Sequence, residues 1–342
     1  MSVTIKDVAR EANVSPSTVS KVMNDSPSIP DITAQHVKEV MKKLHYYPNV
    51  QARNFVKGKT MNIVFLAKIE PHIAFENPHM FDILCGVYEA LAQKGYNLSI
   101  VGIHDSKEST ATVERIIAQK SADGIIVHGS STTEGLADIL LKTHFPHIIV
   151  GKPNFKSQVC WIDVNHFLSG QLAAEHLCKC GFKKIAFIGI NVDDKIFSQR
   201  LNGFLSVMKK KGLPVPNEYI KYGNNSSKKS CSLMNELLSC PSRPDAVICE
   251  DNVVAFGAMR AIKQSCLKMP DEVGLICFDN YPLSEIMDPM PTVVDVNVHD
   301  MGVQAATLLL RKIHHPELQV QAFTTMPVLK IRSSTVASAA NN

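Results

Sequence analysis

Hydrophobic positions in the first 45 residues repeat every three or four residues, which is the period of an amphipathic α-helix. Three such runs follow one another, with a tight turn at Asn13-Val14 between the first two. Thr4 precedes the first run and Ser15-Pro16 the second, and both are typical helix starts. The three apolar faces are Ile5, Val8, Ala9 and Ala12, then Val19, Val22 and Met23, then Val37, Val40, Met41 and Leu44.

These runs predict a small all-α unit that contains a helix-turn-helix. Its second helix presents Ser17, Ser20 and Lys21 outward, and the second helix of such a motif is the one that enters a major groove of DNA. A generic three-helix module that binds other proteins has the same pattern. Spacing alone leaves both interpretations open.

From Met61 onward, short apolar runs alternate with amphipathic stretches. This alternation predicts α/β units with parallel sheets, and it starts again after residue 164. The predicted strands are 61–67, 97–103, 124–129 and 147–151, then 184–190, 219–223, 246–250 and 273–279. The predicted helices are 81–95, 110–121 and 134–144, then 167–181, 199–212 and 253–265.

Charge is distributed unevenly along the chain. Residues 1–60 contain nine Lys or Arg and five Asp or Glu, whereas the remainder contains 27 of each kind. The whole net charge of +4 therefore lies in the first sixth of the chain. This asymmetry favours a nucleic-acid-facing unit on a neutral body, although charge alone is also compatible with a solvated charged face.

The composition disfavours several other classes of protein. The N-terminal segment is charged and lacks the apolar core of a signal peptide, and no run approaches ~20 apolar residues. Nine cysteines without paired spacing fit a reducing cytosol, and we interpret His176, Cys178 and Cys180 as structural. No serine nucleophile elbow or phosphate loop is present. We therefore expect a cytoplasmic protein with no enzyme activity, no cofactor, no metal and no membrane partner.

The N-terminal segment TIKDVAREANVSPSTVSKVMN, followed by YYPNVQARNF, resembles the headpiece of the lactose-repressor (LacI/GalR) family of bacterial transcription regulators. GFKKIAFIG, SQRLNGF, EDNVVAFGAMRAI and MPDEVGLICFDN resemble the effector domain of that family in the same order. The resemblance covers residues 2–335. It implies a helix-turn-helix headpiece (1–48), a hinge helix (49–60) and a periplasmic-binding-protein-like body (61–342) of two doubly wound parallel-sheet subdomains. The expected subdomains are 61–162 with 291–324, and 163–290 with 325–336.

The same resemblance implies a set of DNA contacts. Pro16 and Ser17 stand at the first two base-reading positions of the recognition helix, and Lys21 stands at the other. Because proline cannot hydrogen-bond to a base edge, we expect specificity to rest on few hydrogen bonds together with DNA shape. Positions that contact phosphate or the groove edge in the family are Thr4, Ser15, Thr18, Ser20, Asn24, Thr33 and Asn49.

In the hinge, Phe55 stands where the family usually has a leucine that enters the minor groove as an apolar wedge. Phenylalanine also serves as an unstacking wedge. Ala52 and Arg53 belong to the same DNA-contacting set, and we expect Arg53 and Lys57 to lie near phosphates. The alternative is that Phe55 packs between the headpiece and the body.

Ligands of such bodies bind beyond the carboxyl ends of the strands, between the two subdomains. Arg200 and Asp279 stand at the family's effector-binding arginine and carboxylate, a pair suited to the vicinal hydroxyls of a sugar. Without the resemblance, we would interpret Arg200 as a helix-start arginine and Asp279 as a strand-end cap. The other expected effector residues are Phe75, Asn77, His128 and Asp251.

Together these observations predict a homodimeric, nucleoid-associated bacterial transcription regulator, most simply a repressor. We expect it to bind a near-palindromic operator in double-stranded DNA and to respond to a small-molecule effector, most simply a sugar. A free solute-binding protein and a sugar-handling enzyme are the alternatives. The basic headpiece argues against the first, and the lack of a reaction centre argues against the second.

Overall fold

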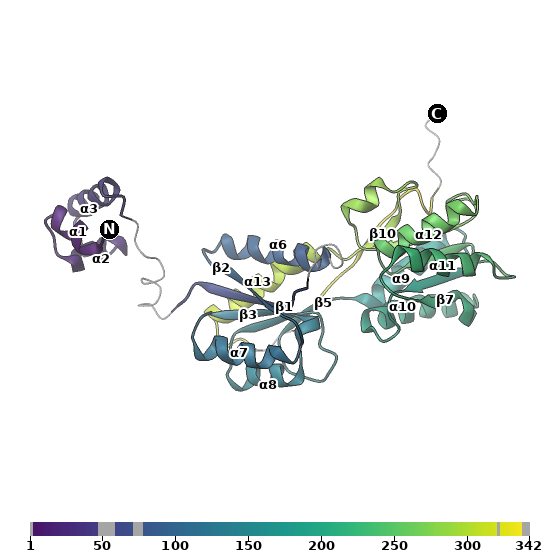
Figure 1. Ribbon diagram of the computed structural model, residues 1–342, viewed down its shortest axis with the longest axis horizontal. Coiled ribbons are helices and arrows are strands. Elements are labelled where there is room, and N and C mark those ends of the chain that lie inside the picture. Colours follow the sequence, from purple (N-terminus) through teal and green to yellow (C-terminus); the bar gives the residue numbers. More distant parts are fainter. Residues whose placement is uncertain (1–2, 47–58, 71–77, 320–321, 337–342) are drawn as a thin grey trace, which may run out of the picture. The chain divides into compact units, whose positions relative to one another are not determined.

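The computed structural model describes residues 3–46, 59–70, 78–319 and 322–336 (Figure 1). Its contacts divide the chain near residue 61 into an N-terminal headpiece and a body. The headpiece has one hydrophobic core, and the body contains two six-stranded sheets. None of the described helices combines the length and the hydropathy needed to cross a membrane.

The headpiece contains the three predicted helices, α1 (Ile5–Glu11), α2 (Pro16–Met23) and α3 (Asp31–Lys43). The backbone N–H of Thr4 donates to Asp7 Oδ2 at 3.0 Å, and Ser15 Oγ accepts from the backbone N–H of Thr18 at 3.1 Å, so both predicted helix starts are confirmed. Asn13 turns the chain with a left-handed φ of 52°. The apolar faces meet in one core, at whose centre Val8, Val19 and Val37 are fully buried.

The first lobe of the body is a parallel sheet with helices on both faces. Its strand order is β11-β5-β4-β3-β1-β2. Helices α6 and α13 lie on one face, and α7 and α8 on the other (Figure 1). The strands are β1 (Asn62–Lys68), β2 (Asn97–Ile103), β3 (Gly124–His128), β4 (His147–Val150), β5 (Trp161–Val164) and β11 (Ala322–Thr325). The helices are α6 (Pro78–Ala92), α7 (Glu108–Ala118), α8 (Glu134–Lys142) and α13 (Val298–His314), and η1 (Gly129–Ser131) is a 3₁₀ turn.

The second lobe repeats this plan with the strand order β12-β10-β9-β8-β6-β7, in which only β12 is antiparallel to its neighbour. The strands are β6 (Ile185–Gly189), β7 (Ile220–Tyr222), β8 (Ala246–Cys249), β9 (Gly274–Phe278), β10 (Thr292–Asp295) and β12 (Val328–Lys330). The helices are α9 (His166–Lys179), α10 (Lys195–Lys211), α11 (Ser227–Leu238) and α12 (Asn252–Gln264), with the 3₁₀ turns η2 (Asn217–Tyr219) and η3 (Pro282–Ile286).

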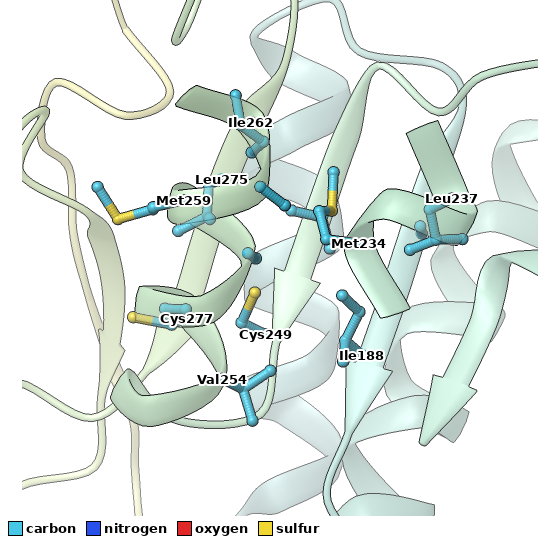
Figure 2. Packing of buried hydrophobic residues seen from close by; sticks show 14 of the residues in the cluster. Ile188, Met234, Leu237, Cys249, Val254, Met259, Ile262, Leu275 and Cys277 are labelled. Atoms are coloured by element: carbon cyan, nitrogen blue, oxygen red, sulfur yellow. The ribbon is translucent and has the colours of Figure 1, made fainter. Parts of the chain in front are cut away.

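The central strands of the second lobe are buried on both faces, which explains why their sequences are continuous apolar runs. Successive side chains point to opposite faces. Cys249 and Cys277 therefore pack with Met234 of α11 and Val254 of α12 (Figure 2). Their sequence neighbours pack on the other face against α9 and α10, where Phe187, Phe204, Ile248, Ile276 and Phe278 form the core.

The eight strands predicted from the sequence and the six helices predicted for the body are all present. One expected boundary is wrong by a few residues. Strand β10 pairs with β9 and β12 of the second lobe, so the chain returns to the first lobe after Asp295 rather than near residue 291. The final crossing lies between Thr325 and Val328, close to the expected position.

Candidate functional site

The exposed surface of α2 carries the predicted base-reading residues. Pro16 occupies the first helical position, Ser17 Oγ lies 2.7 Å from Ser15 Oγ, and Lys21 is exposed. A proline has no N–H to lose at this position, and the Ser15 oxygen satisfies one of the free N–H groups of the helix start. The helix therefore starts sharply, and its first turn is free to face a ligand.

Most of the predicted phosphate contacts in the headpiece lie at helix ends, whereas Ser20 lies in the middle of α2. Thr4 and Ser15 precede α1 and α2, Asn24 ends α2, and Thr33 is in the first turn of α3. Asn24 Nδ2 donates to the carbonyl of Ser20 at 2.8 Å. Helix starts favour anions because their N–H groups are unpaired. Thr18 is half-buried beside Ser15, and its hydroxyl lies 2.8 Å from Ser15 Oγ.

Several predicted residues lie outside the described part of the chain. These are Asn49, Ala52, Arg53 and Phe55 of the expected hinge, and Phe75 and Asn77 of the segment before α6. Their assignments stay predictions from the sequence.

In the body, a cleft of about 910 Å³ is lined by residues of both lobes. The carboxyl ends of parallel strands supply much of this lining, as the sheet topology requires. His128 ends β3, Lys152 follows β4 and Asp279 follows β9. Arg200 comes from α10 and His79 from the first turn of α6. His128, Arg200 and Asp279 were predicted from the sequence, and the structure brings them together.

Asp279 is buried and stands at a sharp bend after β9, with a left-handed φ of 75°. Its carbonyl accepts from Asn252 Nδ2 at 3.0 Å, which fixes the bend. His79 Nε2 lies 2.8 Å from Oδ2, and Arg200 Nη2 lies 3.9 Å from Oδ1. Burial opposes ionisation of Asp279, but His79, Arg200 and His166 together outweigh it and hold the pKa of this carboxyl below its usual value. Asp279 is therefore an anion that faces the cleft.

Arg200 is 5% exposed and is held on three sides. Its Nη1–H donates to the carbonyl of Glu250 at 2.9 Å, and its guanidinium lies 4.2 Å from the ring centroid of Phe278. A Cβ added to Gly170 of α9 would lie 1.9 Å from the carbonyl oxygen of Arg200. Only glycine allows this approach of the two helices, so Gly170 helps to position Arg200.

Polar atoms without partners gather around this pair. Among the described residues, the buried atoms that lack a hydrogen-bond partner include Asp279 Oδ1, Arg200 Nε, His79 Nδ1, His166 Nδ1 and the Tyr281 hydroxyl. A buried polar atom left unpaired costs about 1–3 kcal/mol. Five such atoms near one cleft therefore indicate a place for a polar ligand.

Two further groups, Glu250 beside Arg200 and His128 in the lining of the cleft, have strongly shifted pKa values. Burial raises the pKa of Glu250 to about 7, although the Arg200 guanidinium and the N–H of Ile190, which donates to its Oε2, oppose the rise. Burial lowers the pKa of His128 to about 4, and the neighbouring His79 adds to this effect. His128 is thus neutral at physiological pH, with Nδ1 2.7 Å from Ser130 Oγ.

Models of known protein families match both the headpiece and the body. The model of bacterial regulatory proteins of the lacI family matches residues 4–49, and that of a periplasmic binding protein-like domain matches residues 174–335. The HTH-type transcriptional repressor PurR of Haemophilus influenzae (strain PittGG) is 30% identical over 336 residues, which cover 97% of this chain and 98% of that protein. The protein of the same name from Mannheimia succiniciproducens is 29% identical, with the same coverage.

The chain belongs to the LacI family of bacterial transcription regulators. As a LacI-family member it is a DNA-binding transcriptional repressor and not an enzyme. Solved LacI-family structures share its fold. The Lac repressor dimer bound to operator and the anti-inducer ONPF has a TM-score of 0.83 at 21% identity, over 98% of this chain and 100% of that one. The complex of the transcriptional regulator CelR with cellobiose has a TM-score of 0.71 at 24% identity, over 97% and 99%.

Within this LacI-family body, one predicted effector residue, Asp251, interacts electrostatically with Asp279, His79 and Arg200 but caps a helix. Asp251 caps α12 by accepting from the N–H of Val254 at 2.7 Å, and it is not among the described residues that line the cleft. Conversely, sequence reasoning missed His79, whose imidazole contacts Asp279. The carboxyl-end rule could have found it, because α6 begins at the same edge of the first sheet at which His128 was expected.

The raised pKa of Glu250 predicts a specific pH dependence of stability. The folded chain holds a proton on Glu250 up to about pH 7, whereas the ordinary value is 4.5. The resulting stabilisation is complete below pH 4.5 and is lost as the pH rises through 7. The glutamine in Glu250→Gln does not ionise. Between pH 4.5 and 7.5, the free energy of unfolding should therefore fall less in this variant than in the wild type, and the difference should reach up to about 3 kcal/mol.

Urea unfolding of both proteins at several pH values measures this difference. Glu114→Gln, on the exposed side of α7, is the matched control and should follow the wild type. Identical pH profiles for wild type and Glu250→Gln would show that Glu250 ionises normally in the folded chain.

Proposed function

We propose that this chain is a homodimeric repressor whose operator affinity is set by a neutral, polyhydroxylated small molecule, most simply a sugar, bound in the cleft of the body. The observation that carries the proposal is the buried Arg200–Asp279 pair, whose facing atoms are 3.9 Å apart and lack direct hydrogen bonds to each other. Two adjacent hydroxyls suit such a pair, because each hydroxyl both donates and accepts.

The lining of the cleft supports a neutral and polar ligand. Its described residues include three Lys or Arg and four Asp, so neither sign of charge dominates. The described lining contains no Phe, Tyr or Trp, and Phe75, which the sequence predicts to contact the effector, lies outside the described residues. Two structural neighbours point the same way. One is the CelR–cellobiose complex, and the other is a LacI-family regulator from Enterococcus faecium with bound ribose (TM-score 0.67, 21% identity, 80% of this chain and 98% of that one).

A two-fold assembly fits both the operator and the surface of the body. Dimeric helix-turn-helix proteins bind two half-sites, so a near-palindromic operator matches a homodimer. Phe81 and Tyr88 lie two turns apart on α6 and are 57% and 61% exposed, and Ile100 on edge strand β2 is 54% exposed. Large apolar side chains that are exposed together commonly mark an interface.

The first test is removal of the effector anchor. Arg200→Ala should abolish the change in operator affinity that an effector causes, while the affinity without effector stays within about twofold. The reason is linkage, because a ligand shifts the DNA-binding equilibrium only through its differential affinity for the two states. Operator titrations with a panel of sugars and purine bases measure this.

Arg115→Ala, an exposed arginine on α7 outside the cleft, is the control and should respond as the wild type does. Thermal unfolding of Arg200→Ala establishes that the variant is folded at the temperature of the titration. A full effector response in folded Arg200→Ala would place the effector elsewhere.

The second test concerns the hinge. If Phe55 enters the minor groove as a wedge, Phe55→Ala should weaken specific operator binding by about one to two orders of magnitude, since the bend that the wedge creates permits the headpiece contacts. Non-specific binding should change little, because no positive charge is lost. Phe55→Leu should bind nearly as well as the wild type. Arg53→Ala should lower both affinities and reduce the salt slope by about one.

Operator titrations at several salt concentrations, with a DNA-bending assay, separate these effects. The same complexes analysed by native mass spectrometry should contain two chains per operator. Undiminished specificity and bending in Phe55→Ala would show that this side chain only packs within the protein, and one chain per operator would contradict the homodimer.

A further inference from the structure

A direct contact joins the two lobes at the proposed effector carboxylate. His79 belongs to the first turn of α6 in the first lobe, and Asp279 follows β9 in the second. The His79 Nε2 and Asp279 Oδ2 atoms are 2.8 Å apart. The imidazole also packs on the ring of Tyr281, with centroids 4.8 Å apart. His79 therefore sits on the second lobe although its backbone belongs to the first.

The contact uses only half of the carboxylate. Asp279 Oδ1 has no hydrogen-bond partner, and Arg200 at 3.9 Å is too far away to supply one. The Asp279 side chain is 4% exposed, so water offers little compensation. A buried charge that loses its partner is strongly destabilised. His79 is thus the closest compensation for Asp279 among the described residues.

His79 itself remains accessible. Its side chain is 29% exposed and lines the cleft, although its Nδ1 atom is buried and has no partner. His79 is open to the cleft on one side and contacts the Asp279 carboxylate on the other. It therefore occupies space in which a ligand of Asp279 would bind. Because the Asp279 side chain is buried, a molecule that binds both of its oxygens competes with His79 for the space beside Oδ2.

We propose that His79 acts as an internal stand-in for the effector, a latch between the lobes that the effector displaces from Asp279. This inference rests on the proposed function of the cleft. It also narrows the chemical class of the ligand. The ligand has to donate to both oxygens of Asp279 and accept from Arg200, which adjacent hydroxyls do. Asp279 would repel an anion, and Arg200 would repel a cation. A neutral ligand avoids both repulsions.

The latch is tested first in the protein without ligand, by a double-mutant cycle. His79→Ala should lower the melting temperature by about 2–4 °C in the wild-type chain and should lower it clearly less in an Asp279→Asn background, since the interaction is then already weakened. His315→Ala removes an exposed histidine that pairs with Glu317 at 3.2 Å. This control should have no effect in either background. Equal losses for His79→Ala in the two backgrounds would overturn the latch.

The second test asks whether latch and ligand compete. Calorimetric titrations with cellobiose, D-ribose and D-galactose should show that His79→Ala binds the tightest of these sugars about tenfold more strongly than the wild type, the factor for ~1.4 kcal/mol. His79→Gln keeps a side-chain N–H donor and should bind as the wild type does. Unchanged or weaker binding by His79→Ala would overturn the competition, because His79 would then be neutral or would hold the sugar itself.

The experiments distinguish a wrong proposed function from a wrong latch. If neither the wild type nor His79→Ala binds any of the sugars, the sugar class of the proposed function is wrong. The coupling between His79 and Asp279 in the ligand-free protein still decides whether the latch exists. If the sugars bind but the cycle shows no coupling, the proposed function stands and the latch is wrong.

Discussion

The carboxylate of Asp279 is almost fully buried between the two lobes, and a buried charge is stable only where opposite charge or hydrogen-bond donors surround it. Its partners come from different parts of the body. His79 approaches from the first lobe, and Arg200 approaches from α10 of the second. Arg200 is fixed in turn by the carbonyl of Glu250, by the Phe278 ring and by the close approach of α9 at Gly170. The requirement to compensate one charge thus links the cleft to the packing of both lobes.

The sheets make this arrangement possible. In each lobe the carboxyl ends of the parallel strands lie along one edge, so the residues that follow β3, β4 and β9 can all line one cleft. The hydrophobic cores that pack against the sheets fix the positions of these strand ends. Cys249 and Cys277 pack on one face of the second sheet, and Ile248 and Phe278 pack on the other. Asp279 extends directly from this core, and its left-handed backbone turns the carboxylate into the cleft.

The fold was largely predictable because its patterns are local. Strands buried on both faces are continuous apolar runs, and the helix starts carry Thr4 and Ser15 as caps. The boundary near residue 291 could not be predicted as well, because only strand pairing shows that β10 belongs to the second lobe. The family resemblance predicted Arg200, Asp279 and Asp251 as effector-binding residues. Arg200 and Asp279 line the cleft, and the Asp251 carboxylate caps α12. His79 was missed because its contact joins residues 200 positions apart, which no local pattern reports.

An effector can control such a repressor only if its binding in the cleft is energetically coupled to DNA binding by the headpiece. Linkage requires that coupling to be reciprocal, so an effector that changes operator affinity has its own affinity changed by the operator by the same factor. The most direct measurement is therefore the dissociation constant of the tightest-binding sugar, determined by calorimetry for the free chain and for the chain bound to its operator. The account predicts values that differ by about 5- to 150-fold, matching the factor by which that sugar changes operator affinity. Equal dissociation constants in the two titrations would contradict it.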